Sequence, residues 1–204
     1  MDKQIIIIGA GGHAKVLVDV VKKLNLLVLG MVSLTGEENP IFGIKILGTE
    51  PTILQYTAKS ISLLNGLGML PGPKHKIRQQ LFEKYKAAGY SFVSVIHPCT
   101  IIGLDVQLGE GVQIMAGAVI QPSVVIGNNT IINTKASIDH DCIIGEHCHV
   151  APGATLSGNV IVKNNVHIGT GASIIQGVVI GENSVIAAGA TVYKDVLANT
   201  TYLN

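Results

Sequence analysis

The segment from Ile102 to Ile120, IGLDVQLGEGVQIMAGAVI, carries an aliphatic residue at every sixth position. The same period runs without an insertion from Ile96 to Val192, and the residue four places after each aliphatic, up to Val196, is small or β-branched. A sustained six-residue repeat is typical of a parallel β-helix, in which each hexad forms one side of a triangular coil. We therefore predict about five stacked coils, with the aliphatic residues inside and Gly or Asn at the strained turns.

The composition argues against nucleic-acid binding. Of the 204 residues, 48% are hydrophobic and only 13% are charged, so the chain can bury a large core or pack against copies of itself. The net charge is +1 without a long basic run, Trp is absent and aromatic residues make up 4%. Neither a phosphate-neutralising patch nor a base-stacking platform is expected.

The same composition predicts a cytoplasmic protein that does not insert into a membrane. No apolar run is long enough to cross a bilayer, and the apolar start of the chain fits a buried strand better than a secretory signal. The three cysteines include no Cys-x-x-Cys pair, which indicates free thiols in a reducing compartment.

Residues 1–92 follow a different pattern, the alternation of strand and helix. Strands are predicted at 5–8 and 27–34, and a third strand with its exit loop over 60–68. Helices are predicted from near residue 12, over 48–59 with Thr49 as N-cap, and over 77–88. The first helix is expected to bury Val16, Leu17, Val20, Val21 and Leu24. Strand and helix alternation implies a small, Rossmann-like parallel sheet, so we predict an α/β domain over 1–92 and a β-helix domain over 93–204.

The turn GAGGHA, Gly9 to Ala14, fits the dinucleotide fingerprint G-x-G-x-x-A between a strand and a helix. A NAD site also needs an acidic residue at the end of the second strand, where Ser33 stands instead. We therefore predict that Gly11, Gly12 and His13 cradle the phosphates of a nucleotide-linked sugar. The alternative is that this segment is only a tight turn.

Two cysteines and two histidines have places in the six-residue period. Cys142 and Cys148 fall on the small inward positions, where a thiol packs as a compact hydrophobe. His149 and His167 are eighteen residues apart, so they should stack on one face in adjacent coils.

The residues Asp139, His140 and Asp141 lie outside the core positions. A neutral imidazole takes up a proton near neutral pH, and a carboxylate on its second nitrogen fixes the tautomer and favours the charged ring. The motif therefore suggests a general base, although a surface histidine between two solvated aspartates has the same spacing. A zinc site like that of the γ-type carbonic anhydrases is a further alternative, with His147 and His149 as its close pair of histidines.

Three stretches carry a family resemblance: IIIIGAGGHAKVLVDVV from Ile5, the dipeptide HP at His97, and INTKASIDHDCIIGEHCHVAPGATLSGNV from Ile132. Together they make the whole chain resemble the NeuD/PglD-type bacterial sugar O- or N-acetyltransferases, which use acetyl-CoA. The resemblance implies a left-handed β-helix, a homotrimer with active sites between adjacent β-helices, and acetyl transfer without a metal.

The resemblance also implies roles for individual residues. His140 matches the general base, and Asp141 matches the acidic residue that raises its basicity. The positions that match the acetyl-CoA groove are Asn133, His149, Gly158, Thr170 and Ala188.

The resemblance further implies that the N-terminal domain holds the nucleotide of the acceptor, with Ser33, Gly68 and Arg78 in that site. The UDP-sugar members have an Asp pair near Ser33 and Leu34, which this chain lacks, and its loop from Asn65 to Arg78 is longer. UDP, GDP and dTDP therefore all stay open as the nucleotide.

The predicted function is acetyl-CoA-dependent N-acetylation of a nucleotide-linked 4-amino-4,6-dideoxy sugar, in surface polysaccharide or glycan biosynthesis. O-acetylation of a sialic-acid-type sugar is the first alternative, since one base serves an amine or a hydroxyl. A β-helix scaffold without catalysis and a zinc enzyme are the others.

Overall fold

The computed structural model describes residues 3–33, 35, 40–69 and 76–203. It divides into two compact units, Met1–Val95 and Ile96–Asn204. Leu34 and residues 70–75 of the longer acceptor loop, both noted in the sequence, lie outside the described residues. No helix in the described part of the chain has the length and apolar character needed to span a membrane.

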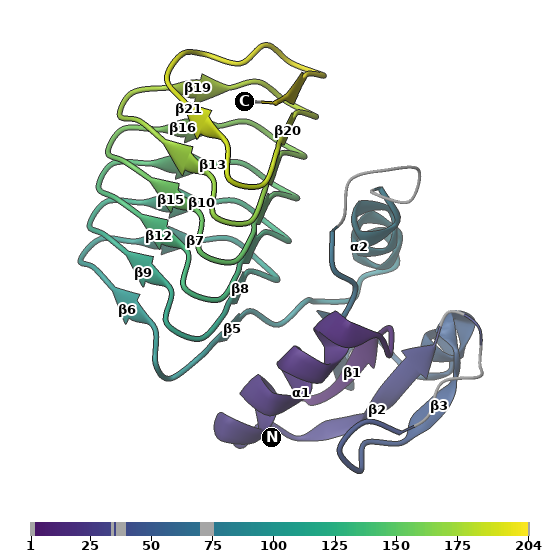
Figure 1. Cartoon of the computed structure of the whole chain (residues 1–204). Helices are drawn as coiled ribbons and strands as arrows, with labels where there is room; N and C mark the ends of the chain where they lie inside the picture. The colour runs from purple at the N-terminus through teal and green to yellow at the C-terminus, as the bar shows by residue number, and fades with distance from the viewer. Residues whose placement is uncertain (1–2, 34, 36–39, 70–75, 204) are drawn as a thin grey trace. The chain divides into compact units, whose positions relative to one another are not determined.

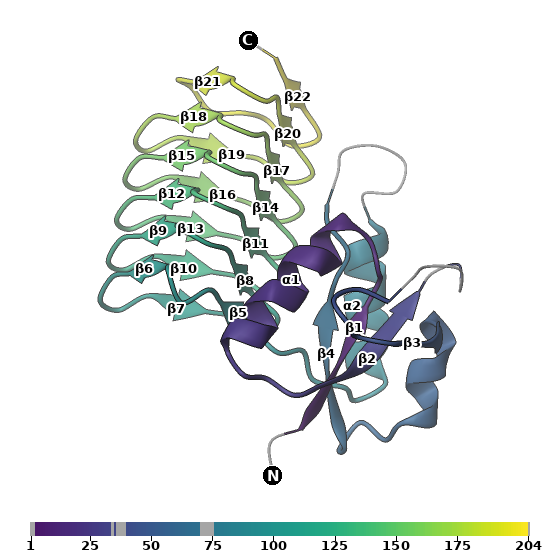
Figure 2. The ribbon, with the colours of Figure 1, turned by 60° about the horizontal axis from the view of Figure 1, so that its bottom comes forward.

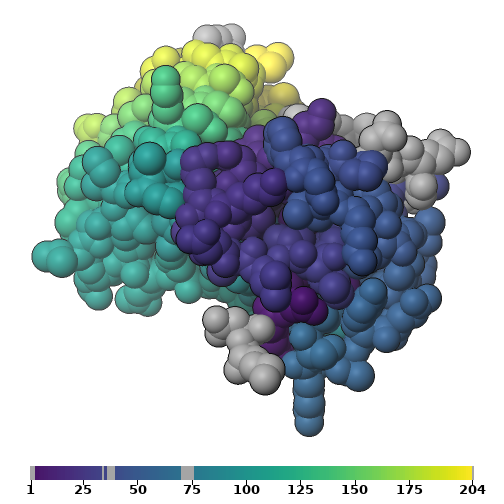
Figure 3. Space-filling model, turned by 90° about the horizontal axis from the view of Figure 1, so that it is seen from below, coloured from purple at the N-terminus to yellow at the C-terminus, as the bar shows by residue number. Residues whose placement is uncertain are grey.

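The N-terminal unit is a four-stranded parallel sheet with the strand order β3-β2-β1-β4 (Figures 1 and 2). Its core lies where the branched side chains of the strands meet the helices, as the predicted α/β architecture requires. The surface formed by this unit is shown in purple to blue in Figure 3. Its elements are β1 (Gln4–Ile8), α1 (Gly12–Lys23), β2 (Val28–Ser33), β3 (Ile46–Thr49), a 3-10 helix η1 (Glu50–Gln55), β4 (Ile61–Asn65) and α2 (Ile77–Ala87).

Three details of this unit differ from the sequence-based expectation. The strand β3 was not predicted, and the helix predicted over 48–59 is the short 3-10 helix η1. The hydroxyl of Tyr85 donates to the carbonyl of Glu50, and that of Tyr90 donates to the carbonyls of Ile53 and Tyr56. A longer α-helix would need these carbonyls for its own backbone hydrogen bonds. In α1 the buried side chains are Ala14, Leu17, Val18, Val20 and Val21, whereas Val16 is 42% exposed.

The helix α2 ends as predicted at Gly89. This glycine has a left-handed φ of 86°, its N–H donates to the carbonyl of Lys86, and the N–H of Tyr90 donates to that of Tyr85. Glycine adopts this conformation without the steric cost of a Cβ, so it terminates the helix.

The C-terminal unit is a left-handed parallel β-helix whose short strands stack into three faces (Figures 1 and 2). Cα partners in adjacent coils, such as Val125 and Ile143, are eighteen residues apart, as the six-residue period predicted. The first face contains β5 (Val95–Ile96), β8 (Gln113–Ile114), β11 (Ile131–Ile132), β14 (His149–Val150), β17 (His167–Ile168), β20 (Val185–Ile186) and β22 (Thr201–Tyr202). The second face contains β6 (Ile101–Ile102), β9 (Val119–Ile120), β12 (Ser137–Ile138), β15 (Thr155–Leu156), β18 (Ser173–Ile174) and β21 (Thr191–Val192). The third face contains β7 (Gln107–Leu108), β10 (Val125–Ile126), β13 (Ile143–Ile144), β16 (Ile161–Val162) and β19 (Val179–Ile180).

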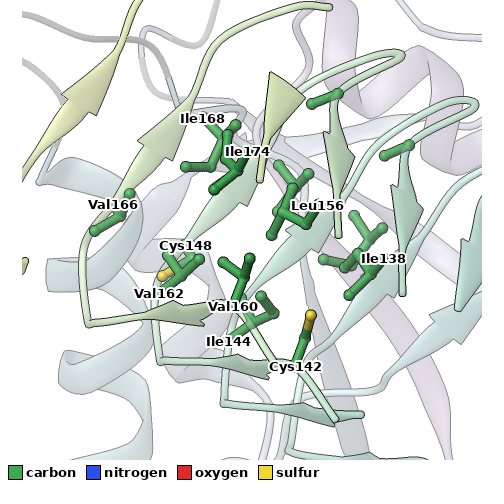
Figure 4. Close-up of a cluster of buried hydrophobic side chains, with 14 of the residues drawn as sticks. Ile138, Cys142, Ile144, Cys148, Leu156, Val160, Val162, Val166, Ile168 and Ile174 are labelled. Carbon is green, nitrogen blue, oxygen red and sulfur yellow. The ribbon is translucent and has the colours of Figure 1, made fainter. Parts of the chain in front are cut away.

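The inward residues of the three faces form one continuous core. Ile138, Ile144, Leu156 and Ile174 are 1% exposed or less, and Figure 4 shows them gathered inside the coils. Because each coil buries its aliphatic residues only against its neighbours, the stacking of coils is what stabilises this unit.

The turns use glycine for two different reasons, and Gly and Asn occupy most of the strained positions, as predicted. The left-handed residue is the third after the aliphatic, as at Asp105 and Gly111, with φ of 59° and 69°. The glycines directly after the aliphatics are needed for space. A Cβ at Gly127 would lie 2.7 Å from the backbone nitrogen of Glu146 in the next coil.

The repeat that begins at Val192 is two residues shorter than the six-residue repeats before it. Val192 still pairs with Ile174 eighteen residues earlier, but Val196 pairs with Ile180 and Tyr202 with Ile186, both at a separation of sixteen. Val196 therefore occupies an aliphatic position and not the small position predicted for it. At this corner the carboxylate of Asp195 accepts the N–H of Val179 at 2.8 Å, and the N–H of Val196 donates to the carbonyl of Val179.

Candidate active site

The segment 139–142 forms the corner between the second and third faces, and its aspartates shape it. Asp141 takes the left-handed position with φ of 59°, a conformation that Asp tolerates better than most residues. The carboxylate of Asp139 accepts the backbone N–H of His140 at 2.8 Å. The histidine between them is therefore held on an outward-facing turn.

His140 and Asp141 form a hydrogen-bonded pair at this corner. The distance from His140 Nδ1 to Asp141 Oδ2 is 2.7 Å, and the two side chains are 55% and 53% exposed. The hydrogen bond to Asp141 raises the pKa of His140, with a smaller contribution in the same direction from the charge of Asp139. With Nδ1–H donated to the carboxylate, Nε2 is the atom that can accept a proton.

Gly158 lies next to the ring, one coil further along the same corner. A Cβ on Gly158 would stand 2.6 Å from Cε1 and 2.7 Å from Nε2 of His140. The N–H of Asn159 donates to the carbonyl of His140 at 3.0 Å, which ties the two coils together. The absence of a side chain at Gly158 is what allows the imidazole its place.

A second group of predicted residues lies at the corner between the first and second faces. Asn133 follows β11, Thr170 follows β17 and Ala188 follows β20. The amide nitrogen of Asn133 is 3.0 Å from Nε2 of His149, which is only 7% exposed, whereas Thr170 and Ala188 are exposed. This corner thus offers a polar pair beside small surface residues.

The structure therefore sorts the predicted β-helix residues into two groups on one chain. It brings Gly158 to His140 and Asp141, and it brings Asn133 to His149, but the two groups occupy different corners of the triangular coil.

The N-terminal residues gather at the carboxyl ends of neighbouring strands. Gly11, Gly12 and His13 begin α1 after β1, Ser33 ends β2, and Gly68 follows β4. A Cβ added to Gly68 would stand 3.6 Å from the Cβ of His13, and one added to Gly11 or Gly12 would meet nothing within 4 Å. The carboxyl edge of an open parallel sheet, next to a helix N-terminus, is where such folds bind anionic ligands.

Two predicted acceptor residues have structural contacts that the sequence did not reveal. Ser33 is fully buried and its hydroxyl accepts the N–H of Thr35 at 3.0 Å. Arg78 is also buried, and its Nη1 donates to the carbonyls of Asn65 and Leu67. Burial lowers the pKa of Arg78 to about 9. Both side chains thus shape the ends of β2 and β4 from the inside.

The cysteines pack as predicted. Cys142 and Cys148 lie in the core of the coils (Figure 4), and burial raises the pKa of the two thiols to about 11 and about 12. Such thiols stay protonated at neutral pH and are poor nucleophiles and poor metal ligands. Within the described residues, no three His, Cys, Asp or Glu side chains are grouped as a metal site.

One residue that the sequence analysis did not assign to the site is His167. It is the ladder partner of His149, and the two rings meet edge to face with centroids 5.0 Å apart and an interplanar angle of 77°. The prediction that His149 and His167 stack on one face, made from their eighteen-residue spacing, is confirmed. That spacing did not suggest a role for His167.

Two family descriptions match the chain. Residues 4–85 match the family described as PglD N-terminal domain. Residues 105–139, 123–158 and 159–194 match the description bacterial transferase hexapeptide (six repeats).

Several solved structures are similar over nearly the whole chain. PerB from Caulobacter crescentus, in complex with CoA and GDP-perosamine, is 34% identical with a TM-score of 0.88, over 97% of this chain and 92% of that one. The acetyltransferase domain of PglB from Neisseria gonorrhoeae, also solved with acetyl coenzyme A, is 30% identical with a TM-score of 0.86, over 96% and 93%. WeeI from Acinetobacter baumannii, at 23% identity and a TM-score of 0.87 over 98% and 96%, shares the fold.

Proposed function

We propose an acceptor and a general base for this chain, which belongs to the NeuD/PglD-type family of sugar acetyltransferases. The enzyme is an acetyl-CoA-dependent acetyltransferase of nucleotide-linked sugars, which sets the scaffold alternative aside. Its acceptor is the amine of a nucleotide-linked 4-amino-4,6-dideoxy sugar, and its product feeds surface polysaccharide or glycan synthesis. The cytoplasm stays the predicted compartment.

The residues at the corner between the first and second faces fit acetyl-CoA. Thr170 and Ala188 are small and exposed in successive coils, which leaves room for an extended chain, and Asn133 and His149 add hydrogen-bonding groups beside them. Bound there, acetyl-CoA supplies an acetyl group that is activated as a thioester.

His140 is the proposed general base, and its pairing with Asp141 is the observation that carries the proposal. Nε2 takes the proton that the acceptor amine releases as its nitrogen bonds to the acetyl carbon. His140 then returns this proton to the sulfur when the carbon–sulfur bond breaks. Asp141 holds Nδ1–H throughout, so the charged ring is stabilised while it carries the proton.

Two copies of the chain would complete one site. The base and the groove residues occupy different corners of a single β-helix, so a base corner of one protomer facing a groove corner of the next would bring them together. This supports the homotrimer predicted from the resemblance, with one site at each junction between adjacent β-helices.

The N-terminal unit would hold the nucleotide. The open space at Gly11 and Gly12, at the first turn of α1, admits a diphosphate close to backbone N–H groups, with His13 and Gly68 alongside. Ser33 and Arg78 would act on the acceptor site by fixing the strand ends that border it.

The test is thiol release from acetyl-CoA with UDP-, GDP- and dTDP-linked 4-amino-4,6-dideoxy sugars, GDP-perosamine among them, and with free sialic acid. The matched control for each amino sugar is the same nucleotide sugar with a hydroxyl at C4. Turnover that needs the amine is the expected result. Turnover with sialic acid alone would instead establish O-acetylation, for which the same base suffices.

A further inference from the structure

The contact between Asn133 and His149 determines which ring nitrogen of His149 carries the proton. Asn133 Oδ1 accepts the backbone N–H of Thr134 at 2.8 Å, so the amide cannot be turned round without losing this bond. Its NH2 group therefore faces His149, with Nδ2 3.0 Å from Nε2. An NH2 group only donates, so Nε2 must be the acceptor, and the neutral ring carries its proton on Nδ1.

The ring of His149 is also held in orientation. His167 lies opposite it in the β14–β17 ladder and packs edge to face, with centroids 5.0 Å apart. Both residues are 7% exposed, and a ring flip of His149 would put Cε1 in the place of Nε2 and so break the amide contact.

We propose that Asn133 and His167 are positioning residues for His149, and that they hold it as a donor through Nδ1–H toward a carbonyl oxygen of acetyl-CoA. The tautomer is a property of this chain alone. Only the carbonyl contact rests on the proposed function, through the groove position of His149.

The chain contains a matched control for this pair. Asn129 Nδ2 lies 2.9 Å from Nδ1 of His147, also eighteen residues away, at the corner between the third and first faces. This pair has the same residue types and the two histidines are similarly buried, while Asn129 is fully buried and Asn133 only partly. No role in the proposed site has been given to either residue.

The first experiment measures the nitrogen chemical shifts of the histidine rings by NMR in the trimeric, 15N-labelled protein without acetyl-CoA. The signal of His149 is identified by its loss in His149→Gln. We expect protonated Nδ1 and bare Nε2 in the wild type. A proton on Nε2 in the wild type would overturn the proposal without involving catalysis at all.

The second experiment exchanges the amide for its isosteric carboxylate. In Asn133→Asp one oxygen still accepts the N–H of Thr134, but the other can only accept from Nε2–H. At about pH 9, above the ordinary histidine pKa of roughly 6.5, the neutral ring should therefore carry its proton on Nε2. The KM for acetyl-CoA should rise about ten- to a hundredfold, and kcat should change less.

Asn129→Asp places the same carboxylate beside His147 and controls for the cost of burying it. Its KM for acetyl-CoA should stay within about twofold of the wild type. An equal rise in KM in both variants would mean that destabilisation, and not the tautomer, weakens binding, and the proposal would fall. If the proton of His149 moves to Nε2 in Asn133→Asp but the KM for acetyl-CoA is unchanged, the contact between His149 and the acetyl-CoA carbonyl is refuted. The proposed function would still hold in that case, provided that turnover of the wild type depends on the amine of the acceptor.

The role of His167 is tested by a change of shape. His167→Val uses the residue found at the same position in the next coil, Val185, and removes the aromatic edge. The KM for acetyl-CoA should rise about two- to tenfold, and His167→Phe, which restores an edge-to-face contact, should recover most of the loss. Equal effects of Val and Phe would remove His167 from the proposal.

Discussion

His140 and His149 belong to the same β-helix, nine residues apart, and their surroundings differ in every respect that governs proton transfer. The ring of His140 is more than half exposed and bonded to a carboxylate, whereas His149 is buried and bonded to an amide. A carboxylate on Nδ1 favours the charged ring, because it accepts a hydrogen bond and carries the opposite charge. An amide NH2 on Nε2 blocks that nitrogen for a second proton. Under the proposed mechanism, the fold would use one residue type as a base at one corner and as a neutral donor at another.

The largest test of this contrast removes the base. In His140→Ala we expect kcat to fall by roughly 100- to 10,000-fold, the range typical of general-base catalysis, since the carboxylates that remain at that corner are ordinarily much weaker bases than an imidazole. Thiol release measures the loss. Acetyl-CoA affinity by calorimetry and the oligomeric state by light scattering should be unchanged, and near-normal turnover would reject His140 as the base.

The next test displaces the base and leaves it chemically intact. In Gly158→Ala the new Cβ would need the space that lies 2.6 Å from His140 Cε1, so the ring must move. A displacement of about 1 Å at a reacting group can cost about a hundredfold, and we expect kcat to fall by that order. The double variant with His140→Ala is the control. If Gly158 acts through His140, adding Gly158→Ala to His140→Ala should cost little more.

The third test alters the basicity of His140. Asn tolerates the left-handed φ at position 141, but it replaces the carboxylate whose hydrogen bond is the main cause of the raised pKa of His140 with a neutral amide. The base works only when its imidazole is neutral. When the pKa of His140 is raised, the ring becomes protonated at a higher pH, and activity is lost from that pH downward. In Asp141→Asn the acid limb of kcat/KM should therefore move to lower pH, and the plateau should fall about tenfold because the base is weaker.

A matched control for this variant is Asp139→Asn. Its oxygen can still accept the N–H of His140, and the charge it removes makes the smaller contribution to the pKa. A larger shift of the acid limb in Asp139→Asn than in Asp141→Asn would reverse the roles of the two aspartates.

The smallest effect is expected for the thiol behind the catalytic corner. Cys142 Sγ lies 3.1 Å from the carbonyl of Ser157 and is fully buried. Cys142→Ala should lower the free energy of unfolding by about 1 kcal/mol through the cavity it leaves, with activity intact. Cys148→Ala, at a corner without His140, should show a similar loss in urea unfolding. A selective loss of turnover in Cys142→Ala would contradict the packing role.

The β-helix was predictable because its period is set by geometry that every coil repeats. An aliphatic residue at each sixth position must point inward wherever hexads stack, so Ile138 and Ile144 could be placed without any tertiary information. His140 and Asp141 were predictable for a related reason, since adjacent residues at a corner need no long-range contact to meet.

The features that the sequence did not reveal depend on contacts that do not follow the six-residue repeat. Val196 fits a small position as well as an aliphatic one, and its pairing with Ile180 depends on contacts with residues about one coil away along the chain. Asn133 meets His149 sixteen residues away, which is not a multiple of the hexad. The 3-10 helix η1 depends on two tyrosine hydroxyls from distant segments, and local propensity carries no sign of them.

The shortened segment after Val192 has a consequence for the corner that it forms. Two residues fewer than a full hexad lie between Val192 and the next aliphatic position, Val196. Val196 and Tyr202 still pair with Ile180 and Ile186, so the shorter length is absorbed at the corner and the ladders continue in register. The stacked faces thus tolerate a corner of a different length, because each face is held by its own ladder of strands.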